Sequence, residues 1–142
     1  MVKPALIEIS AYKTGELQIE VRASIEALMS GINADYKNTQ DAPNADEYDA
    51  YRVLQSEELH QQFERFRSEY LSAITLYAQS AENRQAVPLA IKKVDIPEPG
   101  YTKVPRISTL WLTGRLPETA TELSLNYPAR FSDYAVRVRQ VD

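Results

Sequence analysis

The sequence predicts a mostly β fold of the α+β class, an antiparallel two-layer β-sandwich of about seven strands with a helical insertion between strands 2 and 3. Apolar and polar residues alternate toward both ends of the chain, which is typical of half-buried strands. Between those ends, residues 56–71 repeat their apolar positions at helical spacing. Strands at this density, joined by short turns, favour two packed sheets.

The first 24 residues predict a β-hairpin. The turn Lys13-Thr14-Gly15 contains glycine, which adopts a positive φ without steric cost. Apolar side chains occupy every second position on either side of this turn: Ile7, Ile9, Ala11, Leu17, Ile19, Val21 and Ala23. We therefore expect strands 1 and 2 to be direct neighbours in one sheet.

The helical insertion is predicted over residues 25–73. A first short helical segment ends at Gly31, and residues 32–43 are rich in Asn, Asp and Thr, as loops are. Asn44, followed three positions later by Glu47, fits a capping box at the start of a second helix.

The clearest helix begins at Ser56, with Glu57 and Glu58 in the first turn, where negative charge is favourable. Its apolar stripe consists of Leu59, Phe63, Phe66, Tyr70 and Leu71. A helix with one such stripe buries it, so we expect this helix to lie across a sheet.

Residues 74–142 predict the remaining strands, with apolar positions again at a period of two. These positions are Ile74, Leu76 and Ala78, then Val87, Leu89 and Ile91, then Leu110 and Leu112, then Leu123, Leu125 and Tyr127, and finally Tyr134, Val136 and Val138. The alternation shifts near Lys92 and Lys93, which predicts a β-bulge within one strand over 87–96. Arg137 and Arg139 share a face by parity, and no linker divides the chain, so we expect one domain over 1–142.

The composition excludes several classes of site. The 142 residues include no cysteine, one histidine and four glycines. A disulfide, a thiolate metal site, a cysteine nucleophile and a multi-histidine zinc site are therefore excluded within one chain. No glycine-rich phosphate loop and no GxSxG nucleophile elbow occurs. We expect that the protein is not an enzyme, and we identify no small-molecule substrate.

The net charge of −4 is unevenly distributed. Residues 1–71 hold 7 basic and 13 acidic side chains, whereas residues 72–142 hold 9 and 7. Nucleic-acid binders present a basic stripe, which is not seen here, so we expect no nucleic-acid partner. The acidic excess is greatest between Asp41 and Glu58, and such a run is ordinarily a solvated helix face.

Membrane and export signals are not apparent in the residues given. No segment approaches the roughly 18 apolar residues of a membrane span, and the first residues lack the apolar core of a signal peptide. We expect the chain as given to be soluble, and a chain without cysteine suits either the cytoplasm or the periplasm.

Segments distributed over nearly the whole chain carry a family resemblance. They are residues 3–8, 25–32, 41–45 with 48–49, 105–108 running to 114–117, and 127–133 running to 136–139. In these segments the chain resembles the extracytoplasmic N-terminal region of HupE/UreJ-type membrane proteins, which are hydrogenase or urease accessory and nickel-permease-like proteins.

The resemblance implies a location on the periplasmic face of the inner membrane, with a signal peptide before the domain and transmembrane helices after it. Neither is present in the residues given, so we expect the chain to be an excised piece. Chains of this kind often begin with a histidine that could bind metal through its amino terminus, and this chain cannot display that group. The implied partners are the membrane-embedded remainder of the same polypeptide and other proteins, and the implied ligand is nickel or another divalent cation. The expected function is a non-catalytic interaction or sensor domain.

Residues 41–49 form the first candidate site. Asp41, Asn44, Asp46 and Asp49 offer oxygen ligands at a spacing similar to a calcium loop, although the central glycine and terminal glutamate of an EF-hand are missing. Cation binding and partner recognition are the functional alternatives. The structural alternative is that Asp41 closes a turn and Asn44 caps the helix.

His60 is the candidate metal ligand. Glu57 and Glu64, at i−3 and i+4, share its helix face and could complete a transition-metal site. A lone histidine beside an apolar stripe is more often a boundary residue, so the sequence assigns no metal site firmly.

Arg106 is the binding candidate in the second half of the chain. Together with Arg130, Arg137 and Arg139 it either pairs with helix carboxylates, faces solvent, or contacts an anion or lipid headgroup. Trp111 and the nine tyrosines leave a carbohydrate- or peptide-binding sandwich as a further alternative.

Overall fold

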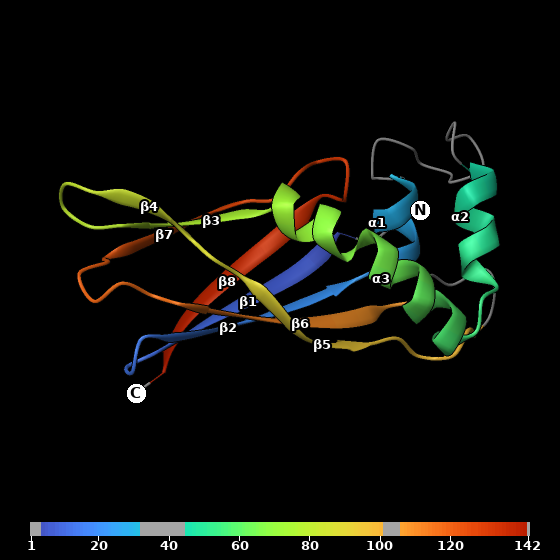
Figure 1. Ribbon diagram of the computed structural model, residues 1–142, viewed down its shortest axis with the longest axis horizontal. Coiled ribbons are helices and arrows are strands. Elements are labelled where there is room, and N and C mark those ends of the chain that lie inside the picture. The colour runs from blue at the N-terminus through green and yellow to red at the C-terminus, as the bar shows by residue number, and fades with distance from the viewer. Residues whose placement is uncertain (1–3, 32–44, 101–105, 142) are drawn as a thin grey trace.

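The computed structural model describes residues 4–31, 45–100 and 106–141. These residues form eight strands and three helices, which confirms the mostly β, α+β class (Figure 1). The strands are β1 Ala5–Tyr12, β2 Glu16–Ala23, β3 Thr75–Gln79, β4 Arg84–Val87, β5 Ala90–Asp95, β6 Ser108–Arg115, β7 Glu122–Asn126 and β8 Tyr134–Val141. The helices are α1 Ile25–Ser30, α2 Ala45–Arg52 and α3 Ser56–Ala73.

Five strands form a large sheet in the order β5-β6-β2-β1-β8. β1 and β2 are the predicted hairpin, with Ile7 opposite Val21 and Ile9 opposite Ile19. Gly15 in the turn has a φ of 93°, the left-handed conformation that favours glycine. The four apolar side chains are almost fully buried, so the period of two correctly marks the inner face of the sheet.

The second layer has two parts. β3, β4 and β7 form a small sheet in the order β4-β3-β7, which lies over one half of the large sheet, and α1 and α3 lie over the other half (Figure 1). The predicted stripe of α3 faces inward, because Leu59, Phe63 and Tyr70 are fully buried and Phe66 and Leu71 pack against the core. Each fully buried side chain of this size contributes about 1.5–3 kcal/mol, so packing holds α3 to the sheet.

The helix ends follow local signals in the sequence. The N–H of Ala27 donates to Ser24 Oγ at 3.2 Å at the start of α1, and Gly31, with a φ of 79°, ends that helix as predicted. The N–H of Gln55 donates to Glu58 Oε1 at 3.2 Å at the start of α3. α2 begins at Ala45, while the predicted cap before it lies outside the described residues.

The prediction of one strand over 87–96 is wrong in one respect, because this segment belongs to two strands, β4 and β5. The chain leaves the small sheet after β4 and joins the large sheet at β5, passing through Pro88 and Leu89. Proline lacks the N–H that would continue a ladder, so a strand ends naturally at this point. The predicted bulge is confirmed within β5, where the register shifts between Ile91 and Lys93.

The predicted antiparallel sandwich is confirmed for the other strand pairs, and one pair differs, because β1 and β8 pair in parallel along their whole length. The segment after β7 returns the chain to the beginning of β1. There the N–H of Ala5 donates to the carbonyl of Asp133 at 2.8 Å and to Ser132 Oγ at 3.2 Å. β8 therefore starts beside the start of β1 and runs in the same direction.

Candidate interaction surface on the open side of the sandwich

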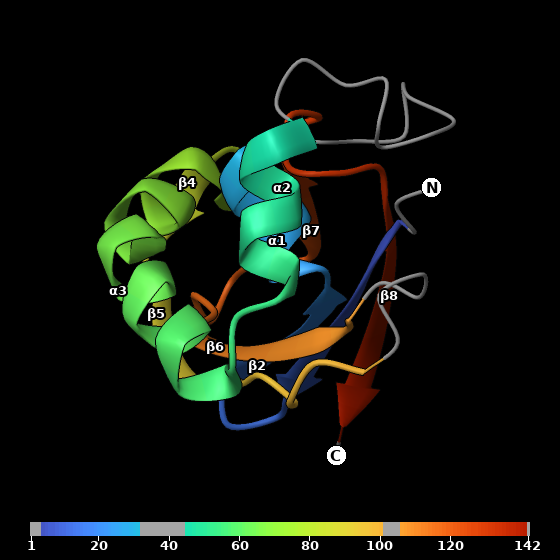
Figure 2. The same ribbon diagram turned by 90° about the vertical axis from the view of Figure 1, so that its right-hand side faces the viewer.

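The two sides of the sandwich are closed differently. On one side the chain passes directly from β4 to β5 and so links the two sheets. On the other side β7 and β8 are the outermost strands of their sheets, and no strand of the described residues joins them. Figure 2 shows β8 at one margin of the large sheet, with α3 and β5 at the opposite margin. We call the free edges of β7 and β8, with the space between them, the open side.

The inner face of β8 is far more exposed than the inner face of β1. Val136 lies opposite Ile7, and Val138 lies opposite Ile9. The two valines are 39% and 50% exposed, whereas the two isoleucines are 3% and 1% exposed. All four side chains are apolar and share one face of the sheet. The difference arises because the opposing sheet has only three strands and does not extend over β8.

A hollow of about 340 Å³ lies between β7 and β8, and we call it the inner hollow. Its size is at the lower end of the range of ligand pockets, about 300–1,000 Å³. Among its described lining residues, Glu122 alone carries a titratable side chain. The lining residues are Ala11, Leu116, Ala120, Thr121, Glu122, Leu123, Val138 and Gln140. The inner hollow therefore offers space and mixed apolar and polar contacts.

The outer edge of β8 presents backbone groups that β1 does not use. The carbonyl of Asp133 accepts from Ala5, and the carbonyl of Val141 accepts from Lys13 at 3.0 Å, so odd-numbered residues direct their backbone groups toward β1. Successive residues of a strand alternate in direction. The residues that direct their N–H and C=O groups away from β1 are therefore Tyr134, Val136, Val138 and Gln140.

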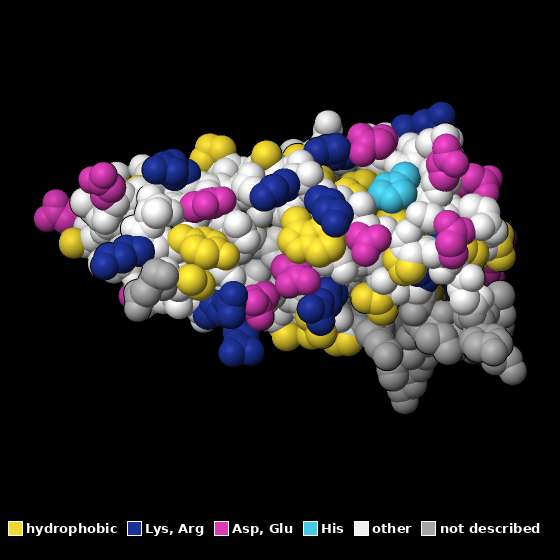
Figure 3. Space-filling view, turned by 90° about the horizontal axis from the view of Figure 1, so that it is seen from below, with side chains coloured by type: hydrophobic (Ala, Val, Ile, Leu, Met, Phe, Trp, Pro, Cys, Tyr) yellow, Lys and Arg dark blue, Asp and Glu magenta, His cyan; other side chains and the backbone are white. Residues whose placement is uncertain are grey.

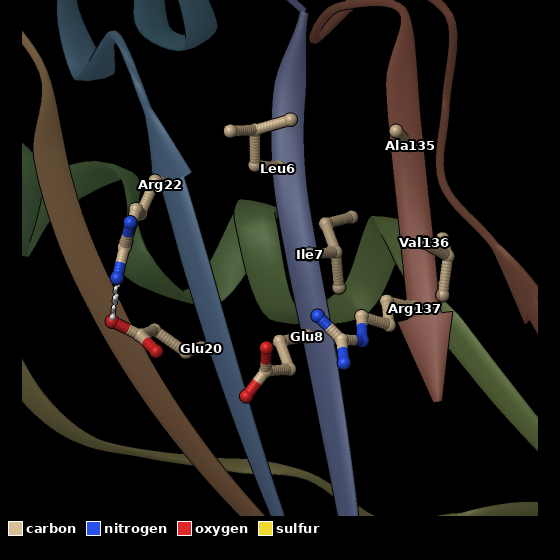
Figure 4. Close-up of a pocket in the computed structure, with 8 residues that line it drawn as sticks. All are labelled: Leu6, Ile7, Glu8, Glu20, Arg22, Ala135, Val136 and Arg137. Carbon is tan, nitrogen blue, oxygen red and sulfur yellow. Dashed lines mark hydrogen bonds and ion pairs between the residues drawn. The ribbon is translucent and has the colours of Figure 1, made fainter. Parts of the chain in front are cut away.

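A second hollow, of about 260 Å³, lies on the opposite face of the large sheet over β1, β2 and β8, and we call it the outer hollow. Figure 4 shows the Arg22 side chain directed at Glu20, and the Arg137 guanidinium extending from β8 over β1. Arg22 Nε lies 3.3 Å from Glu20 Oε1, and Arg139 Nε lies 3.6 Å from Glu8 Oε1. Arg137 forms no ion pair with another described residue.

One row of side chains crosses the outer face of all five strands of the large sheet. In order across the sheet it consists of Arg137, Glu8, Glu20, Trp111 and Lys93. Glu8 and Glu20 lie directly opposite one another and repel, and the neighbouring arginines offset this repulsion. Lys93 Nζ lies 5.0 Å from the centre of the Trp111 ring, within the range of a cation–π contact. Charges of both signs are also mixed with hydrophobic side chains over the face seen in Figure 3.

An aromatic cluster fixes the beginning of β8. The Tyr134 ring lies 5.4 Å from the Tyr127 ring, which lies 5.7 Å from Phe131. The hydroxyls of Tyr127 and Tyr70 are 3.2 Å apart. Burial raises the pKa of Tyr127 to about 12 and also raises the pKa of Tyr70 well above its usual value. Both phenols are therefore neutral at pH 7, and the cluster packs against Tyr134, which is itself 41% exposed at the start of β8.

Arg106, predicted as a binding residue, holds the fold together. Its Nε lies 3.2 Å from Glu26 Oε2, and both side chains are almost fully buried. The guanidinium also donates to the backbone carbonyls of Leu54 at 2.8 Å, Pro97 at 3.1 Å and Tyr51 at 3.2 Å. Of the alternatives that the sequence left open, the structure shows pairing with a helix carboxylate.

The candidate site in residues 41–49 is only partly described. Asp41 and Asn44 lie outside the described residues, while Asp46 and Asp49 are exposed on α2. Asp49 Oδ1 lies 3.9 Å from Arg52 Nη1. The described part is a solvated helix face, as the acidic run indicates, and a site formed by all four residues stays a prediction.

The residues of the predicted metal site lie on the outside of α3. His60 is half-buried and visible at the surface in Figure 3, and Glu57 and Glu64 are exposed. Glu64 Oε1 lies 3.1 Å from Arg67 Nη1, so this carboxylate has another partner. Across the described residues, no group of three or more His, Asp or Glu side chains is placed to hold a metal ion.

Sequence reasoning missed the open side. The alternation at Tyr134, Val136 and Val138 predicts a covered face, but its cover depends on how far the opposing sheet extends. One signal is nevertheless present, because Arg137 and Arg139 lie on a strand without acidic residues. Charged side chains are typical of the outermost strands of sheets, so this pair of arginines marks β8 as an edge strand.

None of the described helices is both long enough and apolar enough to cross a bilayer. Comparisons of the chain with protein-family models, with curated proteins and with solved structures found no match.

Proposed function

We propose that this chain is a non-catalytic interaction or sensor domain that docks a partner protein on its open side. The supporting observation is β8, an edge strand of eight residues with exposed apolar side chains at Val136 and Val138. Edge strands of this kind are templates for pairing with another chain, and proteins otherwise cover or blunt them.

The positions of the reactive side chains support a non-catalytic function. The single histidine, His60, lies on α3 and lines neither hollow. In the outer hollow, Glu8 and Glu20 each lie close to an arginine that balances their charge.

The proposed context is the extracytoplasmic face of the inner membrane, as part of a HupE/UreJ-type membrane protein. Its support is the sequence resemblance, which extends from residues 3–8 to residues 136–139. In this context the partners are the membrane-embedded remainder of the polypeptide and other proteins. The proposal includes a link to nickel or another divalent cation, and the sequence resemblance is the sole support for that link.

Site-specific photo-crosslinking tests the docking function in the full natural reading frame, expressed in its own membrane. A photoreactive side chain replaces Val138 on the open side, and a matched control replaces Lys92, which is exposed at the opposite edge of the same sheet. We expect a discrete protein adduct from position 138 and none from position 92. Equal adducts at both positions, or no adduct at position 138, would contradict the proposal.

The membrane context has its own test, which is the natural reading frame itself. A HupE/UreJ-type protein requires several apolar segments of about 20 residues after this domain. A reading frame without them would refute the membrane context and leave the docking function to the crosslinking experiment.

A further inference from the structure

We infer that the open side receives an extended segment of a partner protein, in which apolar residues alternate with acidic residues, as an additional strand beside β8. This inference rests on the proposed function and specifies its partner. Three properties of β8 carry it: the direction of its backbone groups, the exposure of its inner face and the charge of its outer face.

The backbone property concerns hydrogen bonds. The N–H and C=O groups of Val136 and Val138 point away from β1, at an edge that no described strand covers. Groups in this arrangement are satisfied by an extended backbone at the ladder spacing, about 4.8 Å away. This is strand addition, in which main-chain hydrogen bonds supply affinity and side chains supply specificity.

The inner face of β8 determines which residues occupy every second position of the partner segment. Every second residue of an added strand would lie beside Val136 or Val138, next to the inner hollow of about 340 Å³. Apolar side chains at these positions would cover valines that are 39% and 50% exposed. They would also contact Leu123 at the facing edge of β7, which lines the same hollow.

The outer face of β8 determines which residues occupy the intervening positions of the partner segment. Arg137 and Arg139 are the charged residues of β8, and the strand contains no acidic residue. The intervening residues of an added strand would lie beside these two arginines. Arg139 already lies 3.6 Å from Glu8, whereas Arg137 has no ion-pair partner among the described residues. Opposite charges at adjacent cross-strand positions stabilise pairing, so the partner's outward residues should be acidic.

The same arginines argue against a second copy of this chain as the occupant. Two β8 strands related by a two-fold axis pair antiparallel, with outer face beside outer face. In the two registers with the longest overlap, Arg137 would lie opposite Arg137 or Arg139 of the other copy. Like charges at directly opposite positions are unfavourable, so the pattern favours a different chain with acidic side chains.

The binding experiment uses a fluorescent peptide of about ten residues in which Val and Glu alternate, titrated with the folded domain and followed by anisotropy. A peptide of the same length in which Val and Lys alternate is the control probe. We expect binding of the acidic peptide that weakens as salt is added and no binding of the basic peptide. Amide exchange should become slower in β8 when the acidic peptide is bound.

Two variants localise the contact. Val138→Pro removes an N–H that points away from β1, so it should weaken binding more than tenfold while sparing the β1 ladder, and Val138→Thr retains the N–H as its control. Arg137→Glu should weaken binding about fivefold through charge alone. Lys92→Glu makes the same charge change at the opposite edge of the sheet and should leave binding unchanged.

Several results would overturn strand addition. They are equal binding of both peptides, no binding of the acidic peptide at about 1 mM, equal losses from Arg137→Glu and Lys92→Glu, or self-association that protects β8 without peptide. If one of these occurs while position 138 still gives a discrete photo-adduct, the docking function stands and its mode differs. If neither experiment gives a contact, both proposals fail.

Discussion

Arg106 and Glu26 form an ion pair closed off from solvent, with 3.2 Å between Nε and Oε2 and exposed side-chain fractions of 4% and 1%. Burial is the largest influence on the pKa of Glu26 and raises it, whereas the charge of Arg106 lowers it. Glu26 Oε1 has no hydrogen-bond partner among the described residues. Among the described side chains, Arg106 is therefore the one that hydrogen-bonds this carboxylate.

Arg106→Met should lower the free energy of unfolding at pH 7 by about 3–5 kcal/mol, because it leaves a buried carboxylate uncompensated. Without Arg106 the pKa of Glu26 rises further in the folded state. An acid with a raised folded-state pKa favours folding below its unfolded pKa, and this advantage is lost as pH rises through the folded pKa. The deficit of the variant should therefore shrink as pH falls from 7 toward 4.5, as measured by urea denaturation.

The control for this prediction is Arg139→Met. Arg139 also faces a glutamate, at 3.6 Å, but its side chain is 54% exposed. Its replacement should change the free energy of unfolding by no more than about 0.5 kcal/mol. If the Arg106→Met deficit were equally large at both pH values, the Glu26 carboxylate would not be its source.

Tyr127→Phe should lower the free energy of unfolding by about 1–3 kcal/mol at pH 7, because it leaves the buried Tyr70 hydroxyl without its partner at 3.2 Å. Each phenol has a raised pKa, so each favours folding below pH 10, and this contribution is lost as pH rises toward 12. The variant has one such phenol fewer, so its stability should fall less steeply above pH 10. Denaturant unfolding at pH 8 to 11.5 measures the two slopes, and identical slopes would show that Tyr127 titrates normally.

Neighbouring positions on β6 should respond differently to truncation. Leu112 is buried on the inner face, 1% exposed, so Leu112→Ala should lower the free energy of unfolding by about 2–5 kcal/mol. Trp111 lies half-buried on the outer face beside Lys93, so Trp111→Ala should cost only about 1–2 kcal/mol. Thermal or urea unfolding of the two variants measures both, and a larger loss for Trp111→Ala would contradict the assigned faces.

Gly114 lies on β6 and packs against the crossover from β4 to β5, so it should not tolerate a side chain. A Cβ there would lie 3.1 Å from Leu89 Cδ2 and 3.1 Å from Val87 Cγ1. Gly114→Ala should therefore lower the free energy of unfolding by about 1–3 kcal/mol. Gly100→Ala is the matched control, because nothing lies within 4 Å of its added Cβ. A neutral Gly114→Ala in calorimetry would show that the crossover is loosely packed.

Short-range patterns in the sequence predicted most of the fold. The β1–β2 hairpin follows from alternation around Gly15, and the inward face of α3 follows from the spacing of Leu59, Phe63 and Tyr70. The division at Pro88 was not predicted, because alternation continues through a strand that changes sheets. A proline inside an apparent strand is a signal for such a division.

The candidate site was less accessible to sequence reasoning, because it depends on which elements lie opposite one another. Val136 and Ile7 have the same apolar character and share one face of the sheet, but Ile7 lies on a strand that is flanked on both sides and Val136 lies on the outermost strand. Arg106 was named as a candidate, but its partner Glu26 lies 80 positions earlier in the chain. No local pattern distinguishes such a buried pair from a surface pair.

The parallel pairing of β1 with β8 also has a mechanical consequence. Ala5 begins β1 and Val141 ends β8, and these two points lie at opposite ends of the sheet (Figure 1). Tension between them slides the two strands past each other, so the hydrogen bonds of the ladder share the load and break together. Tension across the β1–β2 hairpin opens its ladder one bond at a time, and single-molecule stretching should record a lower force there. A domain pulled along its strands by a tether and a bound partner would thus resist extension where its first and last strands meet.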